Sequence, residues 1–328
     1  MTPANLLRTR FGYIAARAIG VAVELDLFTR MAEGKASLHE LCLATRSSER
    51  GLRALLKALV PLDLVREDRP GHFQTSPESE RYLVSHSPHY LGGMIRQADR
   101  LWERWGRLGE AVRSGLPPEA GIESNEDDGR FFSEFVQGLY NLNAPAAREL
   151  ARELARFEPA RVLDVGAGSA VWSLALVAER PATLVTALDR ERVLEQVTRA
   201  YVREHGAENY YSFLAGDLRE SELEPEGYDL VILGHVLHSE GREGSRRLLA
   251  RAFRALRPGG ALAVAEVVPD AEQSDVYSWL FGLHMLLLTT EGDVFEASEL
   301  EALVGEAGFG ALRWPELPGP YAVLLARR

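Results

Sequence analysis

The chain has 328 residues and a mass of 36.3 kDa, more than one small hydrophobic core usually fills, so its length favours two domains. Its 46% hydrophobic and 26% charged residues are typical of a globular protein and exclude disordered, collagen-like and small disulfide-bonded classes. The single cysteine, Cys42, excludes an internal disulfide and a cysteine-rich metal site, and we assign no metal ligands.

The hydropathy pattern predicts a protein that is neither exported nor anchored in a membrane. Arginines at positions 8, 10 and 17 interrupt the apolar N-terminal segment, which is unlike a signal peptide. The longest uncharged apolar stretch, residues 276–290, is shorter than the roughly 18 residues that span a bilayer. We therefore expect a cytoplasmic location.

Charge is distributed unevenly along the chain. Residues 1–158 contain 21 basic and 22 acidic side chains, whereas residues 159–328 contain 16 basic and 26 acidic ones. The net charges are thus −1 and −10. An acidic half repels nucleic-acid phosphates, so we expect no nucleic-acid partner.

The first 158 residues show helical patterns and one short hairpin. Ser37 and Glu40 match a capping box, the apolar residues within 51–59 recur at helical spacing, and residues 64–76 predict two strands around a turn. This order is typical of a winged helix. Further helices are expected around residues 101–112 and 131–157, with a linker rich in Pro, Gly and acidic residues at 115–129.

From residue 160 onward, apolar strands alternate with helices, which predicts a parallel sheet covered on both faces. The expected strands are residues 161–165, 183–189, 210–216, 228–234 and 259–267, and the expected helices start at Ser169, Glu191 and Gly244. The end of the chain, residues 308–328, predicts two strands joined through a turn.

A glycine loop follows the first of these strands. The sequence LDVGAGS places Gly166 and Gly168 where open parallel sheets bind ligands. A dinucleotide fingerprint needs Gly or Ala at the position of Val171, and the chain has no phosphate-binding GxxxxGK[ST] motif. Asp189 and Asp217 end the next two strands, where carboxylates could accept hydrogen bonds from ribose hydroxyls and an adenine amino group, or could serve only as turn residues.

These segments, together with YDLVILGHVLH and LRPGGALAVAE, resemble the class I S-adenosylmethionine-dependent methyltransferases. With the winged helix, nearly the whole chain resembles the small-molecule O-methyltransferases of plant caffeic acid and bacterial polyketide metabolism. The resemblance implies an α/β fold: a Rossmann-like, seven-stranded, mostly parallel sheet in residues 159–328, preceded by a mainly α-helical winged-helix dimerisation domain in residues 1–158. It also implies S-adenosylmethionine as cofactor, a small-molecule acceptor and a homodimer formed through the N-terminal domain.

The same resemblance implies roles for individual residues. His238 would be the general base and Glu266 the carboxylate that orients it, with His235 as the rival base. The cofactor would be bound by Asp164, Gly166, Gly168, Asp189, Asp217 and Leu218. The acceptor pocket would be lined by Phe131, Phe135, Leu139, Trp279, Met285 and Thr289.

Four positions depart from the family pattern. Val294 stands where a second orienting carboxylate is usual, Ser239 and Glu240 replace an aspartate-tryptophan pair, and Ala170 replaces the third loop glycine. Methylation of carbon or nitrogen, and a relative that has lost methyl transfer, therefore remain open. A DNA-binding regulator is disfavoured because residues 37–80 contain 6 basic and 7 acidic side chains.

Overall fold

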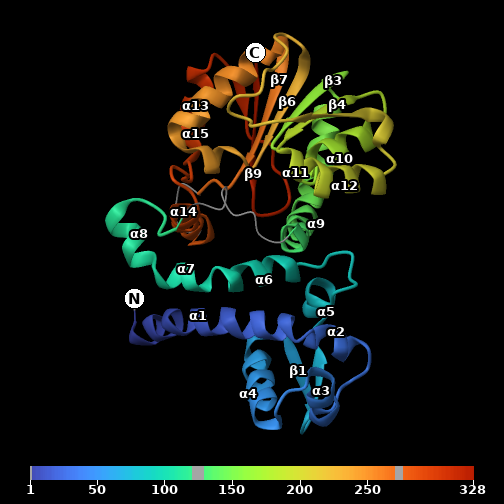
Figure 1. Cartoon of the computed structure of the whole chain (residues 1–328), viewed down its shortest axis with the longest axis vertical. Helices are drawn as coiled ribbons and strands as arrows, with labels where there is room; N and C mark the ends of the chain where they lie inside the picture. The colour runs from blue at the N-terminus through green and yellow to red at the C-terminus, as the bar shows by residue number, and fades with distance from the viewer. Residues whose placement is uncertain (1, 120–128, 270–275) are drawn as a thin grey trace. The chain divides into compact units, whose positions relative to one another are not determined.

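The computed structural model of the chain describes residues 2–119, 129–269 and 276–328, without the side chains of Arg8 and residues 129–134 (Figure 1). Most of the linker expected at residues 115–129 lies outside these ranges. Every helix within them is too short or too polar to cross a lipid bilayer.

The chain divides into two compact units. The first comprises residues 1–103 and 130–142, and the second comprises residues 104–129 and 143–328. Helix α9 (Gly129–Ala155) contributes to both units, and the domain boundary predicted at residue 158 falls just beyond its end.

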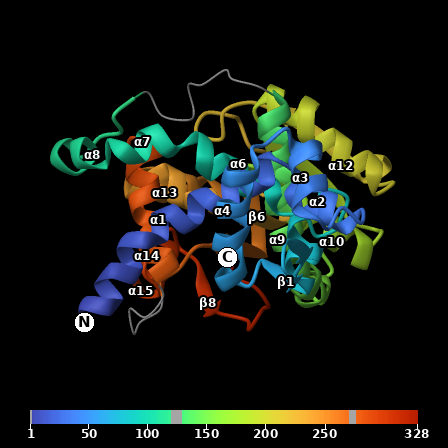
Figure 2. The same ribbon diagram turned by 90° about the horizontal axis from the view of Figure 1, so that it is seen from below.

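The first unit contains the predicted succession of helices followed by a hairpin. Helix α1 packs against α4 and α6 (Figures 1 and 2). The capping box predicted at Ser37 and Glu40 is present at the start of α3. The elements are α1 (Pro3–Glu24), α2 (Leu27–Ala32), α3 (Leu38–Thr45), α4 (Glu49–Leu59), η1 (Val60–Leu62), β1 (Val65–Arg69), β2 (His72–Thr75), α5 (Pro77–Leu83) and α6 (Gly92–Arg100). Strands β1 and β2 pair in antiparallel fashion, as the sequence predicts.

The second unit is built on a seven-stranded sheet in the order β5-β4-β3-β6-β7-β9-β8. Strands β5, β4, β3, β6 and β7 run parallel to one another, and β9 is antiparallel to both β7 and β8. This confirms the predicted mostly parallel sheet. The strands are β3 (Arg161–Val165), β4 (Leu184–Asp189), β5 (Tyr211–Ala215), β6 (Tyr228–Gly234), β7 (Leu256–Glu266), β8 (Gly310–Arg313) and β9 (Ala322–Arg327).

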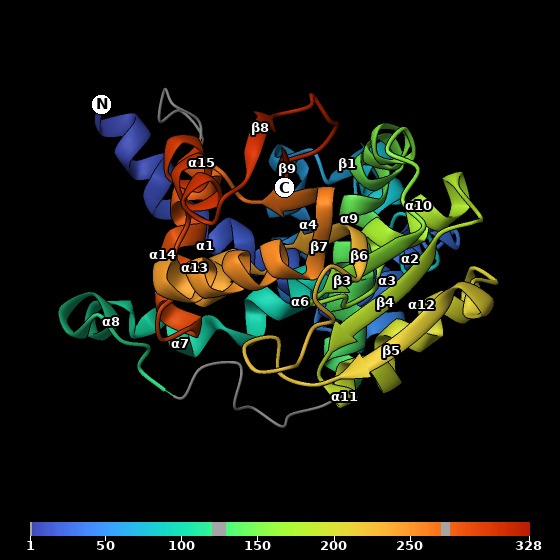
Figure 3. The same ribbon diagram turned by 90° about the horizontal axis from the view of Figure 1, so that it is seen from above.

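Helices cover both faces of this sheet, with α10 and α12 on one side and α13 and α15 on the other (Figure 3). The central strands are therefore buried on both faces, which explains their near-continuous apolar sequences. The remaining elements are α7 (Trp102–Gly106), α8 (Leu108–Ser114), α10 (Val171–Glu179), α11 (Glu191–Val193), η3 (Leu194–Thr198), α12 (Arg199–Glu204), η4 (Glu208–Tyr210), α13 (Leu237–Ala255), α14 (Val276–Leu288) and α15 (Ala297–Glu306).

The predicted start of the helix after β6 is wrong, and the error concerns the turn that carries His238. Helix α13 begins at Leu237, not at Gly244, because a first turn precedes a break at Gly241. Gly241 has a φ of 63°, and a Cβ there would lie 2.3 Å from the carbonyl oxygen of Glu291, so only glycine fits. The break interrupts the helical periodicity and hides the turn that carries His238.

Candidate active site

The loop after β3 brings the backbone close to the carboxyl end of the sheet. Gly166 and Gly168 have φ values of +67° and +51°, and a Cβ on Gly166 would lie 2.7 Å from the side chain of Val236. Ala170, at the third loop position, also has a positive φ of 57°. Alanine is therefore tolerated there at a cost of roughly 1–2 kcal/mol that glycine would avoid.

Asp189 ties this loop to the end of β4. One carboxylate oxygen accepts a hydrogen bond from the backbone N–H of Gly168 (2.9 Å), and the other accepts one from Arg190 (2.8 Å). Burial raises the pKa of Asp189, although both N–H groups act in the opposite direction. Since a carboxylate offers about four lone pairs, this one retains the capacity to accept from further hydroxyl groups.

Asp217 follows β5 and is exposed, and it accepts a hydrogen bond from the N–H of Arg219 (2.7 Å). Leu218 packs against the main hydrophobic core. The guanidinium of Arg219 donates to both carboxylate oxygens of Glu240, at 2.8 and 3.1 Å. Position 240, where the family pattern expects a tryptophan, thus holds a buried glutamate in an ion pair.

Asp164 lies inside β3 rather than at its end. Its carboxylate is 2% exposed and accepts a hydrogen bond from the hydroxyl of Ser173 in α10. Burial raises the pKa of Asp164 to about 7. The side chain therefore links β3 to α10, and its direct contact with a ligand stays a prediction.

His238 and Glu266 meet at the ends of β6 and β7. The Nδ1 atom of His238 lies 2.7 Å from one carboxylate oxygen of Glu266, and the backbone N–H of Leu237 donates to the other at 2.7 Å. Burial alone would raise the pKa of Glu266, but the nearby His238 imidazole and its hydrogen bonds lower it below the ordinary value. The ionised carboxylate makes Nδ1 the protonated nitrogen and leaves the Nε2 lone pair available.

The neighbouring His235 is held in a different way. Its φ of 59° is a left-handed conformation, stabilised by a hydrogen bond from its N–H to the carbonyl of Ala265 (2.8 Å). Its Nε2 lies 3.3 Å from the side-chain oxygen of Asn143, and the ring of Tyr321 packs edge-on at 4.4 Å. Burial lowers the pKa of His235 to about 4, so its imidazole is neutral near pH 7.

The three side chains share one crevice, since one donor atom from each of His235, His238 and Glu266 lies within 4.8 Å of the others. Such a set could ligate a transition metal. The 2.7 Å hydrogen bond between His238 and Glu266 already uses atoms that a metal would need. The absence of a metal from the site stays a prediction.

An aromatic row on α14 faces His238. Phe281 packs edge-on against His238 at 5.1 Å and stacks on His284 at 5.8 Å, and Trp105 stacks on His284 at 5.9 Å. Sequence reasoning did not single out Phe281, His284 or Trp105, nor Asn143 and Tyr321. The helical spacing of Phe281 and His284 was the available signal.

The predicted acceptor-pocket residues occupy varied positions. Trp279 is 37% exposed and, at 100° per residue, lies on the face of α14 opposite Phe281. Met285 and Thr289 are buried, and the Thr289 hydroxyl donates to the Met285 carbonyl at 2.8 Å. Phe135 and Leu139 are partly buried in the first unit, and the side chain of Phe131 lies outside the described residues. Their contact with an acceptor stays a prediction.

Val294 is buried beside this crevice and supplies no carboxylate. Its neighbour Asp293 bonds through its backbone N–H to the carbonyl of His238 (2.9 Å), while its carboxylate lies 3.7 Å from Arg242. Within the described part of the chain, Glu266 is the carboxylate that contacts His238.

The depressed histidine pKa values predict a pH-dependent stability. Burial lowers the pKa of His284, like that of His235, to about 4 from an ordinary 6.5. Between these values the unfolded chain binds protons that the folded chain does not, so stability present above pH 6.5 is lost as the pH falls toward 4. Replacing His284 with Gln should reduce this loss by on the order of 1–3 kcal/mol, as measured by urea unfolding at pH 6.5 and 4.5. Identical losses in both proteins would contradict the assignment.

The chain is similar to known methyltransferases along nearly its whole length. The profile of an O-methyltransferase domain matches residues 105–310, and that of an O-methyltransferase dimerisation domain matches residues 7–85. The polyketide 8-O-methyltransferase TcmO of Streptomyces glaucescens is 30% identical over 99% of this chain and 97% of its own length. The N,N-dimethyltransferase OxyT of Streptomyces rimosus is 29% identical over 93% and 90% of the two chains. Human N-acetylserotonin methyltransferase, solved in complex with S-adenosylmethionine, has a similar fold, with a TM-score of 0.87, 24% identity and coverage of 100% and 98%.

Proposed function

Because the chain belongs to the O-methyltransferase family, whose methyl donor is S-adenosylmethionine, we propose that it methylates a hydroxyl of a small aromatic or polyketide-like acceptor with His238 as general base. The observation that carries this proposal is the 2.7 Å hydrogen bond between His238 and the buried Glu266. It fixes the tautomer whose Nε2 can take a proton.

The residues at the glycine loop fit the cofactor. Gly166 and Gly168 let the backbone approach it, and the spare lone pairs of Asp189 suit the ribose hydroxyls. Asp217 and Leu218 would hold the adenine, and Arg219 paired with Glu240 would border it. When bound, the cofactor supplies an electrophilic methyl group on a sulfonium.

His238 and Glu266 together would remove the proton of the acceptor hydroxyl. The Nε2 atom of His238 accepts the proton of the acceptor hydroxyl as its oxygen attacks the methyl carbon. Glu266 stabilises the imidazolium that results, through the bond already made at Nδ1. His235, neutral and bonded to Asn143, adds no competing positive charge beside it.

The shape of the acceptor follows from the aromatic row. Phe281 provides a flat ring next to His238, and the rings of His284 and Trp105 continue the row from it. Flat surfaces of this kind bind planar ring systems by offset stacking. TcmO, a similar protein, is named as a polyketide methyltransferase, which supports an aromatic polyketide as acceptor class.

The proposal is tested by incubating the enzyme with S-adenosylmethionine and a panel of hydroxylated and aminated aromatic compounds. Mass spectrometry should detect an O-methylated product and an equal amount of S-adenosylhomocysteine. Products methylated only on carbon or nitrogen would contradict it, as would cofactor binding without S-adenosylhomocysteine formation on any compound.

Nitrogen methylation is the second candidate, supported by the similarity to OxyT and by Val294. A neutral amine attacks without prior loss of a proton, so one orienting carboxylate would suffice and positioning could supply most of the rate. A second arm of the panel therefore compares matched phenol and aniline acceptors.

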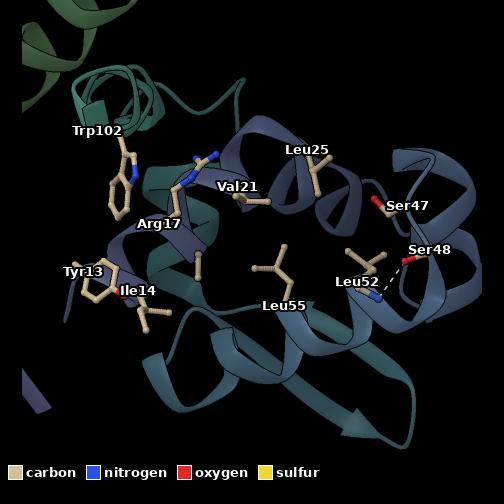
Figure 4. Close-up of a pocket in the computed structure, with 12 residues that line it drawn as sticks. Tyr13, Ile14, Arg17, Val21, Leu25, Ser47, Ser48, Leu52, Leu55 and Trp102 are labelled. Atoms are coloured by element: carbon tan, nitrogen blue, oxygen red, sulfur yellow. Dashed lines mark hydrogen bonds between the residues drawn. The ribbon is translucent and has the colours of Figure 1, made fainter. Parts of the chain in front are cut away.

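We further propose a homodimer formed through the first unit. An apolar groove of about 570 Å³ lies between α1 and α4, with Ile14 and Leu55 pointing into it (Figure 4). Tyr13 and Phe11 on α1 are 57% and 54% exposed and add aromatic surface to the same helix. The match to a dimerisation domain supports this role. A cytoplasmic location and the absence of a nucleic-acid partner remain predictions.

Light scattering should give about twice 36.3 kDa for the native protein. Ile14→Glu should give the monomer mass, because a charge buried in an apolar interface loses its hydration. Leu62→Glu, at an apolar residue of 39% exposure outside the groove, is the matched control and should remain dimeric. A native monomer at micromolar concentration would refute the proposal.

A further inference from the structure

A buried hydrogen-bond donor at the edge of the proposed cofactor site has no acceptor. Trp172 lies in the first turn of α10, directly after the glycine loop, and is 5% exposed. Its Nε1 atom is buried, and no described residue accepts a hydrogen bond from it. Buried polar groups are nearly always paired, so an acceptor from a bound ligand would account for this donor.

The position of the indole is fixed by Gly234 at the end of β6. A Cβ on Gly234 would lie 2.6 Å from Cδ1 and 2.7 Å from Nε1 of Trp172, so only glycine leaves room for this ring. The ring of His235, the next residue, lies 5.9 Å away. The free N–H is therefore at the carboxyl end of β6, one residue before the strained turn that leads to His238.

The strand order indicates which part of the cofactor reaches this point. Asp189 and Asp217 follow β4 and β5, on one side of β3, whereas Trp172 and Gly234 meet at β6 on the other side. If the nucleoside lies over β4 and β5, as the proposed function requires, the amino-acid end extends across the glycine loop toward β6.

Only one group at the amino-acid end of the cofactor is a strong hydrogen-bond acceptor. An indole N–H is a donor only and needs an electron-rich acceptor. The ammonium and the sulfonium of the cofactor are positively charged, whereas its carboxylate accepts hydrogen bonds strongly. We propose that Trp172 Nε1 donates a hydrogen bond to the methionine carboxylate of S-adenosylmethionine and that Gly234 is required to admit the indole.

The inference predicts a loss of affinity for S-adenosylmethionine but not for its decarboxylated form, measured by calorimetry in the absence of a methyl acceptor. Trp172→Phe keeps an aromatic ring but removes the donor, and should weaken S-adenosylmethionine binding by about 10- to 100-fold, as expected for a hydrogen bond to a charged group. Binding of decarboxylated S-adenosylmethionine should change by less than about 3-fold, a difference that lost packing would not produce.

The matched control is Trp314→Phe, whose indole donates to Glu301 at 2.7 Å and which should leave both affinities unchanged. Gly234→Ala should displace the indole through its added Cβ and cause the same selective loss of affinity for S-adenosylmethionine. This variant keeps the inference testable if Trp172→Phe does not fold. Equal losses for both ligands, or no loss in either variant, would overturn the inference. Failure of the native protein to bind S-adenosylmethionine would instead overturn the proposed function.

Discussion

His238→Ala should lower turnover by about 10²- to 10⁴-fold while leaving S-adenosylmethionine affinity nearly unchanged. A phenol with a pKa near 10 is mostly protonated at neutral pH, so its oxygen is a poor nucleophile until a base removes the proton. The Nε2 atom of His238 is oriented for this by the bond from Nδ1 to Glu266. Because Val294 supplies no second carboxylate, we expect a factor near the lower end of that range.

His235→Ala is the matched comparison for this experiment. Its imidazole is already bonded to Asn143 and packed against Tyr321, so its loss should reduce turnover much less. Turnover and calorimetric affinity are measured on both variants with the acceptor identified in the panel. If His238→Ala retains more than about half of native turnover, the base assignment is wrong, and transfer driven by positioning alone becomes the better account.

Asp189→Ala is expected to have the largest effect on cofactor binding, at least 1–3 kcal/mol, or roughly 5- to 150-fold in affinity. The substitution removes the charged acceptor proposed for the ribose hydroxyls. It also leaves the N–H of Gly168 without its 2.9 Å partner, so the glycine loop loses its tie to β4. Calorimetry with S-adenosylmethionine measures both consequences together.

Asp229→Ala offers a control with the same backbone chemistry at the opposite, amino ends of the parallel strands β3 and β6. Its carboxylate accepts hydrogen bonds from the N–H groups of Ala160 and Arg161, at 2.7 and 2.8 Å. It should lower the melting temperature but leave the affinity of the folded protein unchanged. Unchanged affinity for S-adenosylmethionine in Asp189→Ala would refute the ribose assignment. An equal loss of affinity in Asp189→Ala and Asp229→Ala would show that the effect comes from lost stability of the fold.

The sequence predicted those parts of the fold that local patterns encode. Buried strands such as residues 228–234 are near-continuous apolar runs, and the capping box at Ser37 is a short-range signal. The start of α13 was missed because the positive-φ break at Gly241, where a Cβ would collide with the distant carbonyl of Glu291, interrupts the helix. A contact of that kind leaves no local periodicity to detect.

The same distinction applies to the candidate site. His238 and Glu266 were paired through the family resemblance, and the structure places them 2.7 Å apart. Asn143 and Tyr321 lie far from His235 in the chain and bear no motif, so only the folded arrangement shows their contacts with it. The unpaired donor of Trp172 is likewise a property of packing rather than of sequence.

The most direct test of base catalysis uses a series of phenolic acceptors of similar shape, with pKa values from about 10 down to about 7. Turnover of the native protein and of His238→Ala is measured on each acceptor at saturating S-adenosylmethionine and fixed pH. If His238 removes the acceptor proton, the deficit of the variant should shrink steadily as the acceptor becomes ionised in solution. A deficit that stays constant across the series would contradict His238 as the general base.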